Sequence, residues 1–312
     1  MKILVFGKDG QLGKAFKKIL DGLPIAHDVK YVGRAECDLS HVSEIDELLT
    51  SFKPDLVINA AAYTAVDKAE QEVDLAFAIN ATAPETMATY CAHHEASFLH
   101  YSTDYVFDGS GTDFYLESHL TGPLGVYGKS KLAGEQAVEK AFQGASDKAC
   151  YAIFRTSWVY GMGGNFIRTI LRLAKEREEL KVIHDQHGVP TSAEWLAQIS
   201  LDLSIDSAGC LREFPSGIYH AVPAGETTWH GLACLVVQAS LDAGVAMKAK
   251  PASILPIPAT DYPLPAPRPM NSRMSTQKLQ KVLSQYGLMS KFPQWDEQVR
   301  DYVADLAKNQ LI

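Results

Sequence analysis

The fold of this chain is decided near its start, by the stretch Lys2-Ile3-Leu4-Val5-Phe6-Gly7-Lys8-Asp9-Gly10-Gln11-Leu12-Gly13. Its first five residues form the short apolar run that is typical of a buried parallel strand. The apolar pattern from Leu12 to Leu20 predicts a helix that begins directly after the glycines. Glycines in such a turn let the backbone approach a pyrophosphate, and the N-terminus of the helix stabilises its negative charge. The stretch therefore predicts the first unit of a dinucleotide-binding domain.

Apolar runs alternate with helical patterns through the first half of the chain. We predict strands at residues 30–34, 55–61, 96–99 and 153–159, and helices at 41–51, 74–92 and 132–142. This alternation implies an α/β fold, a Rossmann-like doubly wound parallel sheet with helices on both faces. Ligands of such sheets bind beyond the carboxyl ends of the strands, where Asp38, residues 60–64 and Thr103 fall.

The pattern changes after about residue 160, which predicts two domains. Residues 1–160 would form the dinucleotide-binding Rossmann domain, and residues 161–312 a smaller mixed α/β domain that mainly binds the substrate. In the second part we expect a helix at 166–178, a strand at 217–220 and an amphipathic helix at 277–286. The proline-rich segment 251–269 is either a linker or an ordered loop that delivers Arg268 to the site.

The composition is that of an ordinary globular protein, with 312 residues, 46% hydrophobic and 21% charged. A net charge of −8 argues against general nucleic-acid binding. The five scattered cysteines suit reduced thiols in a cytoplasm. We find no signal peptide and no apolar run of the roughly 20 residues that span a bilayer. We therefore expect a cytoplasmic protein without a membrane partner.

The segment Tyr127-Gly128-Lys129-Ser130-Lys131 carries the predicted chemistry. Residues four apart share one face of a helix, so the Lys131 ammonium can reach the neighbourhood of the Tyr127 hydroxyl. A nearby cation lowers the pKa of a phenol from its usual value of about 10, towards the range of a general acid or base. Thr103, at the end of a predicted strand, can hydrogen-bond the substrate oxygen beside the tyrosine.

These motifs together resemble the dTDP-4-dehydrorhamnose reductase family of the extended short-chain dehydrogenase/reductase superfamily. The resemblance runs the whole length of the chain and rests on the glycine turn, on the late Arg268-Pro269 and on the stretches 59–67, 101–109, 127–135 and 154–160. It implies reduction, with NADPH or NADH, of the C4 keto group of dTDP-4-dehydro-β-L-rhamnose to dTDP-β-L-rhamnose. Such an oxidoreductase catalyses the last step of dTDP-rhamnose biosynthesis, and its product is a sugar donor for bacterial cell-surface polysaccharides.

The resemblance also implies roles for individual residues. Catalysis would use Tyr127 as the general acid, Thr103 as the hydrogen-bond partner of the carbonyl, and Lys131 as the cation that stabilises the phenolate. Substrate would contact Thr103, Asp104 and Trp158. The cofactor would contact the catalytic pair Tyr127 and Lys131 and the residues Gly7, Gly10, Gln11, Leu12, Arg34, Asp38, Leu39, Ala62, Tyr63 and Thr64.

Cofactor choice and metal binding are the points where single residues matter. Arg34 favours NADPH because an arginine side chain suits a 2′-phosphate. Glu36 or Asp38 could still accept a hydrogen bond from the ribose 2′-hydroxyl of NADH. Some relatives dimerise through a magnesium ion held by glutamates, one of them in the first helix. That helix carries lysines and no acid here, and Glu194 alone is a weak site. Magnesium is therefore doubtful, and we expect a monomer or a metal-free homodimer.

Two other functions stay open at this point. Other nucleotide-sugar enzymes, such as 4-epimerases or 4,6-dehydratases, share the fold and the Thr, Tyr and Lys. A non-catalytic subunit resembling the regulatory β subunit of methionine adenosyltransferase is the second alternative. His220, Trp229 and His230 are interpreted as structural, and the remaining histidine pairs lack a convincing set of metal ligands.

Overall fold

The computed structural model describes residues 1–288 and 291–312. Its centre is a six-stranded parallel sheet with the strand order β2-β1-β3-β4-β5-β10. The order reverses at β1, and the glycine turn follows that strand. The strands are β1 (Lys2–Phe6), β2 (Asp28–Val32), β3 (Leu56–Asn59), β4 (Ser97–Thr103), β5 (Tyr151–Thr156) and β10 (Gly217–His220). The Rossmann-like doubly wound sheet predicted from the sequence is confirmed.

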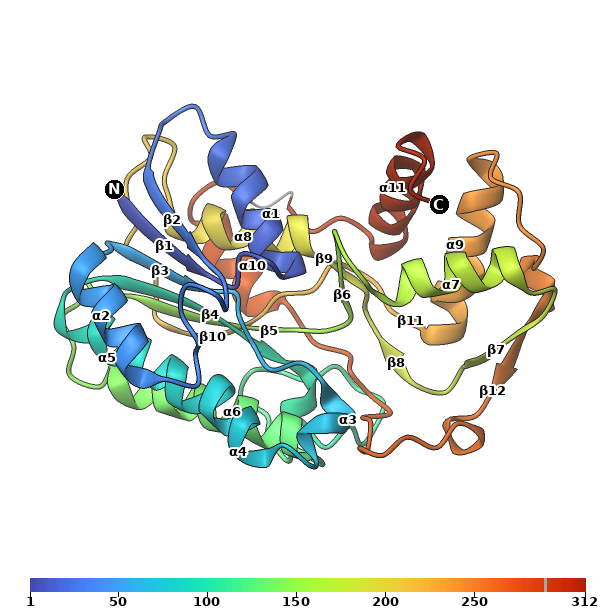
Figure 1. Ribbon diagram of the computed structural model, residues 1–312, viewed down its shortest axis with the longest axis horizontal. Helices are drawn as coiled ribbons and strands as arrows, with labels where there is room; N and C mark the ends of the chain where they lie inside the picture. Colours follow the sequence, from blue (N-terminus) through green and yellow to red (C-terminus); the bar gives the residue numbers. More distant parts are fainter. Residues whose placement is uncertain (289–290) are drawn as a thin grey trace.

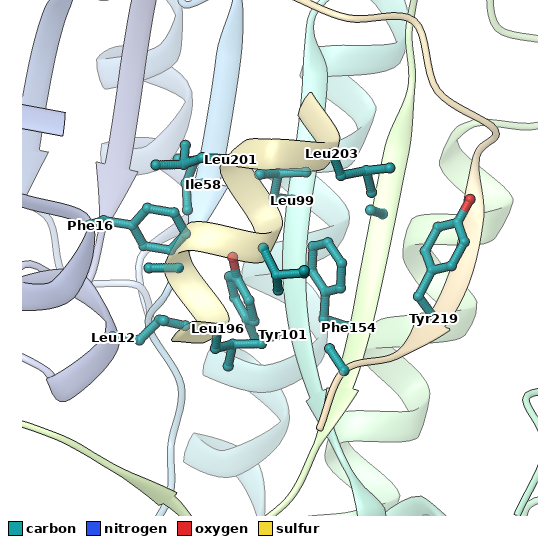
Figure 2. Packing of buried hydrophobic residues seen from close by; sticks show 14 of the residues in the cluster. Leu12, Phe16, Ile58, Leu99, Tyr101, Phe154, Leu196, Leu201, Leu203 and Tyr219 are labelled. Atoms are coloured by element: carbon teal, nitrogen blue, oxygen red, sulfur yellow. The ribbon is translucent and has the colours of Figure 1, made fainter. Parts of the chain in front are cut away.

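Helices cover both faces of the sheet because its strands are apolar on both sides (Figure 1). One face packs against α1 (Gln11–Asp21), α8 (Ala193–Ser204) and α10 (Gln277–Ser284). The other packs against α2 (Val42–Phe52), α5 (Ala83–His93) and α6 (Val126–Ala141). Figure 2 shows the first face, where Phe16 of α1 and Leu196 of α8 pack near Tyr101 of β4. Successive strand residues alternate between the two cores, so that Ile3 enters one and Leu4 the other.

The predicted helix at 74–92 is built from three consecutive elements. The helix α4 (Val73–Phe77) continues into a π-helical turn, Ala78–Thr82, and then into α5. A short helix, α3 (Val66–Ala69), precedes them. The π turn holds Asn80, which is 1% exposed. Such turns inside helices are rare and often mark functional sites.

The remaining elements form a second layer beside the sheet, on the right in Figure 1. Its core lies among α7 (Phe166–Glu176), α9 (Trp229–Asp242) and α11 (Trp295–Lys308). Three short strand pairs complete it: β6 (Val159–Tyr160) with β9 (Thr191–Ser192), β7 (Leu180–Ile183) with β12 (Ile254–Ile257), and β8 (His187–Gly188) with β11 (Thr227–Thr228). Among the described residues, the helices without a counterpart in the sequence predictions are the short α3 and the longer α8, α9 and α11.

The second half of the chain also builds part of the sheet layer. The strand β10 is an edge of the sheet, and α8 and α10 cover one of its faces. A boundary at residue 160 therefore does not coincide with the boundary between the two layers. Residues after it build most of the second layer, but they also contribute β10, α8 and α10 to the sheet layer. No helix among residues 1–288 and 291–312 combines the length and the apolar character needed to cross a membrane.

Candidate functional site

A cleft of about 820 Å³ lies at the carboxyl ends of the sheet strands and extends to the second layer. Fifteen of the residues that the sequence predicted for cofactor, substrate or catalysis line it, whereas Glu36 and Arg268 do not. The fifteen are Gly7, Gly10, Gln11, Leu12, Arg34, Asp38, Leu39, Ala62, Tyr63, Thr64, Thr103, Asp104, Tyr127, Lys131 and Trp158. The fold brings them together from five strand ends and from the start of α6.

The glycine turn forms one end of the cleft, and its packing explains why glycine is needed. A Cβ at Gly13 would lie 2.0 Å from the carbonyl oxygen of Gly7, and one at Gly7 would lie 2.7 Å from the backbone of Ala60. Gly10 precedes α1 and supplies no side-chain cap. The N–H groups of the first helical turn are therefore left for a ligand, and the helix dipole favours an anion there. The turn fits a pyrophosphate.

Charged residues after β2 form the next part of the cleft. The guanidinium of Arg34 lies 3.5 Å from the carboxylate of Asp38, and its side chain is 76% exposed. Glu36 is engaged by the Lys8 ammonium and accepts the Gly33 N–H at 2.9 Å. Hydrogen bonds from the backbone and the side chain of Ser40 have the largest effect on the Asp38 carboxyl, and they lower its pKa. Arg34 is thus a cation held only loosely beside the cleft.

The wall after β3 is fixed by the buried amide of Asn80. This side chain accepts the Tyr63 N–H at 2.9 Å and donates to the Tyr63 carbonyl at 3.0 Å. It also donates to the hydroxyl of Ser130 on α6, at 3.0 Å. The π turn therefore ties the cleft wall at Tyr63 to the helix that carries Tyr127 and Lys131. The sequence placed Asn80 within a helix and gave no signal for this role.

The start of α6 places Tyr127 in the cleft. Glu70 accepts the N–H of Val126 at 2.8 Å, which holds the first turn of the helix. A Cβ at Gly128 would lie 2.2 Å from the carbonyl of Tyr105, so only glycine lets α6 approach the turn after β4 so closely. The rings of Tyr105 and Tyr127 meet edge to face, with centroids 5.4 Å apart. Tyr127 consequently stands beside Thr103.

The pKa of Tyr127 differs from the sequence expectation. Burial raises the pKa of this phenol to about 12, against the effect of a hydrogen bond with Thr103. The prediction that the pKa of Tyr127 is lowered is therefore wrong for the protein without its ligands, because burial disfavours the charged phenolate and the neighbouring Asp104 carboxylate acts in the same direction. A tyrosine with this pKa keeps its proton at neutral pH, as a general acid must.

Lys131 is 2% exposed and points to the imidazole of His100. The Lys131 Nζ lies 3.5 Å from Nε2 of His100, whose other ring nitrogen is 3.2 Å from the amide of Asn59. Burial lowers the pKa of Lys131 to about 8, and Glu135 acts in the opposite direction. Burial, and then Lys131, hold the pKa of His100 well below its usual value.

Thr103 and Asp104 end β4 and begin a short 3-10 turn, Asp104–Val106. The Thr103 hydroxyl donates to one carboxylate oxygen of Asp104 at 2.9 Å, and the Ser272 hydroxyl donates to the other. Burial raises the pKa of Asp104 to about 6, although both hydrogen bonds oppose it. Asp104 therefore borders the cleft with both oxygens already engaged inside the protein.

Two stacked indoles close the cleft on the side of the second layer. The ring centroids of Trp158 and Trp229 are 3.6 Å apart. Trp158 has a φ of 47°, an unusual conformation for a bulky residue. Trp229 also lines the cleft, so its interpretation as structural is incomplete. His220 and His230 do make the expected structural contacts, with the carbonyls of Ser275 and Ile254.

The proline-rich segment is ordered by tertiary contacts. Its strand β12 pairs with β7, and Arg268 forms an ion pair with Asp67 of α3 at 2.9 Å. The segment is therefore an ordered strap and not a linker. Arg268 is not among the residues that line the cleft.

Lys18 of α1 pairs with Glu194 of α8, at 2.8 Å. The glutamate that the sequence singled out as a weak magnesium ligand thus contacts an ammonium. No group of three potential ligands for a metal occurs among the residues that the structure describes.

A parallel sheet with a glycine turn after its first strand, and with Tyr and Lys on the helix bordering its cleft, is the architecture of extended short-chain dehydrogenases/reductases. Residues 1–308 match the family model described as the RmlD substrate binding domain. A dTDP-4-dehydrorhamnose reductase of Escherichia coli (strain K12) is 45% identical over 289 residues, which cover 90% of this chain and 91% of the relative. The chain belongs to the dTDP-4-dehydrorhamnose reductase family.

Solved structures agree with this assignment. A dTDP-4-dehydrorhamnose reductase of Clostridium acetobutylicum is similar with a TM-score of 0.83 and 33% identity, covering 99% of this chain and 100% of that one. One from Bacillus anthracis, solved in complex with NADP, has a TM-score of 0.84 and 31% identity, covering 97% and 99%. A UDP-glucose 4-epimerase of Thermotoga maritima shares the fold alone, with a TM-score of 0.76 but 14% identity. The epimerase alternative is therefore not favoured.

Proposed function

We propose that this protein reduces the C4 keto group of dTDP-4-dehydro-β-L-rhamnose to dTDP-β-L-rhamnose with NADPH, and that NADH is also used. The observation that carries the proposal is the meeting of Thr103, Tyr127 and Lys131 in one cleft with the glycine turn. The similarity to reductases over 90% of the chain supports the substrate, and the NADP complex of a relative supports the cofactor. The regulatory-subunit alternative is not favoured.

The cleft fits a nicotinamide dinucleotide. The turn at Gly10, Gln11 and Leu12 would hold the pyrophosphate, because its backbone approach and helix N-terminus suit an anion. Asp38 and Leu39 would border the adenine, Arg34 would meet a 2′-phosphate, and residues 62–64 would lie along the cofactor. When bound, this cofactor supplies the hydride.

The side chains of the cleft handle the proton. Negative charge builds on the carbonyl oxygen of the substrate during reduction, and Tyr127 donates its phenolic proton to that oxygen. Thr103 hydrogen-bonds the same oxygen, while the Lys131 ammonium stabilises the phenolate that remains. The raised pKa of Tyr127 keeps the proton in place beforehand. Because the pKa of Lys131 is about 8, the rate of reduction should fall as pH rises through this value.

The two parts of the chain would bind different ligands, the cofactor and the sugar nucleotide. Residues 1–160 would hold most of the cofactor, and residues 161–312 would mainly bind the sugar nucleotide. Trp158, with Trp229 stacked on it, would contact the substrate. We propose a monomer or metal-free homodimer in the cytoplasm, where nucleotide sugars and reduced nicotinamide cofactors are made and used.

One assay tests the reaction directly. Oxidation of NADPH should depend on dTDP-4-dehydrorhamnose, supplied by the upstream dehydratase and epimerase. No turnover with this substrate, together with tight binding to a methionine adenosyltransferase catalytic subunit, would favour the regulatory alternative.

Replacing the acid tests the mechanism. Tyr127→Phe should lower kcat by about 10²- to 10⁴-fold, the usual contribution of a general acid, and leave NADPH binding nearly unchanged. Tyr262→Phe, in a side chain that is 56% exposed, serves as the matched control. A Tyr127→Phe variant with the wild-type rate would remove this residue from the mechanism.

A further inference from the structure

Three buried side chains, two of them neighbours in the sequence and the third far away, form one chain of hydrogen bonds beside the reacting centre. Ser272 donates to one oxygen of Asp104, and Thr103 donates to the other at 2.9 Å. The exposed fractions of Ser272, Asp104 and Thr103 are 2%, 2% and 5%. Water therefore competes little for these groups, and each hydrogen bond matters more than it would on the surface.

The Thr103 hydroxyl can donate only one hydrogen bond, and two acceptors compete for it: the Asp104 carboxylate and the reacting oxygen of the substrate. Ionised Asp104 can only accept hydrogen bonds, so the Thr103 O–H donates to it. The Thr103 oxygen can then only accept hydrogen bonds from other groups. This oxygen also accepts the Tyr105 N–H, at 3.2 Å, and Thr103 lines the cleft together with Tyr127. A protonated Asp104 can instead donate to the Thr103 oxygen, which frees the Thr103 proton for the cleft.

We propose that Asp104 decides whether the Thr103 hydroxyl is free to donate to the reacting oxygen, and that Ser272 is a positioning residue that holds Asp104 in its ionised, accepting state. The catalytic part of this inference rests on the proposed reduction. A donor at the oxygen stabilises the charge that builds there in the transition state, so the reduction is faster when Asp104 is protonated.

Backbone contacts hold the residues around Ser272, which directly follow the proline-rich segment 251–269. The Ser272 N–H donates to the His187 carbonyl at 2.8 Å. The neighbouring Asn271 donates from its backbone to the Gly109 carbonyl, at 3.1 Å, and from its side chain to the Asp113 carbonyl, at 2.9 Å. Contacts of Ser272 and of the preceding residue thus hold the backbone from which the Ser272 hydroxyl reaches Asp104.

The electrostatics of Asp104 come mainly from burial and hydrogen bonding. Burial raises the pKa of its carboxyl to about 6, while Ser272, Thr103 and backbone N–H groups act in the opposite direction. The titratable and charged groups near these three side chains are Tyr105 on the same turn, Tyr127 and Lys131 on α6, and His187 on β8. Two ion pairs also lie nearby: Arg268–Asp67 beyond Tyr105, and Arg273–Glu226 beside Ser272. None of the charged groups is a cause of the Asp104 shift. Removing Ser272 should therefore act on Asp104 directly.

The first experiment needs no substrate. The carboxyl carbon of Asp104 is titrated by NMR in the wild type and in Ser272→Ala. Loss of one buried hydrogen bond to the charged form should raise the pKa of Asp104 by about one to two units. Ser272→Cys keeps the size but donates weakly, so it should give a smaller shift. Ser284→Ala, which removes an exposed hydroxyl bonded to the Lys281 carbonyl, should leave the titration unchanged.

The second experiment follows kcat for the sugar nucleotide against pH. Wild type should lose about tenfold or more in kcat as pH rises through about 6, because Thr103 stops donating in the transition state. In Ser272→Ala this step should move up with the pKa of Asp104, and in Asp104→Asn it should be gone. The KM of Ser272→Ala should change little, whereas a general loss of structure would change KM as well as kcat.

Each outcome decides a separate point. An unchanged Asp104 titration in Ser272→Ala, or a step near pH 6 that persists in Asp104→Asn, would overturn the proposal. A wild-type protein that binds NADPH but does not reduce the sugar nucleotide would refute the proposed function and with it the catalytic role of this chain. The NMR titration would still decide whether Ser272 holds Asp104.

Discussion

Lys131 shows at the scale of one residue how a functional group opposes stability. The side chain is 2% exposed, and burial lowers its pKa from 10.5 to about 8. Between these two values the unfolded chain binds the extra proton, so the free energy of unfolding rises with pH across this window. At pH 7 the folded protein therefore carries the full cost of a buried ammonium.

Lys131→Met should remove that cost while damaging the site. We expect the free energy of unfolding to rise by on the order of 3 kcal/mol at pH 7, and this gain to shrink towards zero above about pH 10.5. Turnover and NADPH affinity should both fall, since the ammonium would serve the phenolate and the ribose. Denaturant unfolding at pH 7 and at pH 10, with initial rates at pH 7, measures these changes. An equal gain in stability at both pH values would contradict the buried-ammonium account.

At the scale of the element, the glycine turn depends on backbone that almost touches itself. A Cβ at Gly13 would lie 2.0 Å from the Gly7 oxygen, whereas none of the described atoms lies within 4 Å of one at Gly164. Gly13→Ala should therefore destabilise the fold by about 1–3 kcal/mol and weaken NADPH binding. Gly164→Ala, the matched control, should change neither quantity. Denaturant midpoints and cofactor titrations compare the two variants, and equal behaviour would refute the role given to the turn.

The loop after β2 is the element that should select the cofactor. Arg34 is 76% exposed and pairs with Asp38 at 3.5 Å, so it can turn to a 2′-phosphate at little cost. Arg34→Ala should lower kcat/KM for NADPH by about 10- to 100-fold, the effect of losing a hydrogen bond to a charged group. The value for NADH should change much less. Measuring kcat/KM with both cofactors decides the point, because an unchanged ratio excludes Arg34 as the selecting residue.

At the scale of the whole molecule, the Lys18–Glu194 ion pair bears on assembly. An ammonium 2.8 Å from the carboxylate opposes the approach of a divalent cation to Glu194. Treatment with EDTA should therefore leave both the molecular mass and the rate of reduction unchanged. Light scattering and initial rates with and without the chelator test this. A loss of mass or rate that magnesium restores would show that other ligands hold a metal.

Much of the fold and of the site was predictable because the signals are local. The glycine turn, the alternation of strands and helices, and the spacing of Tyr127 and Lys131 all involve residues close together in the chain. The strand ends of a parallel sheet meet at one edge, so the cleft residues could be placed without knowing any contact. The helices α8, α9 and α11 were missed, and α8 packs on the sheet layer from a segment far from α1 in the sequence.

Local patterns in the sequence were enough to predict the Rossmann-like sheet, the family and many of the residues that border the cleft. The contacts between residues far apart in the chain came from the three-dimensional fold: Trp229 on Trp158, Asn80 on Ser130, and Ser272 on Asp104. It also reversed the expected direction of the pKa shift of Tyr127. The physical reason is that desolvation depends on everything packed around a group, whereas spacing along a helix reports only its nearest neighbours.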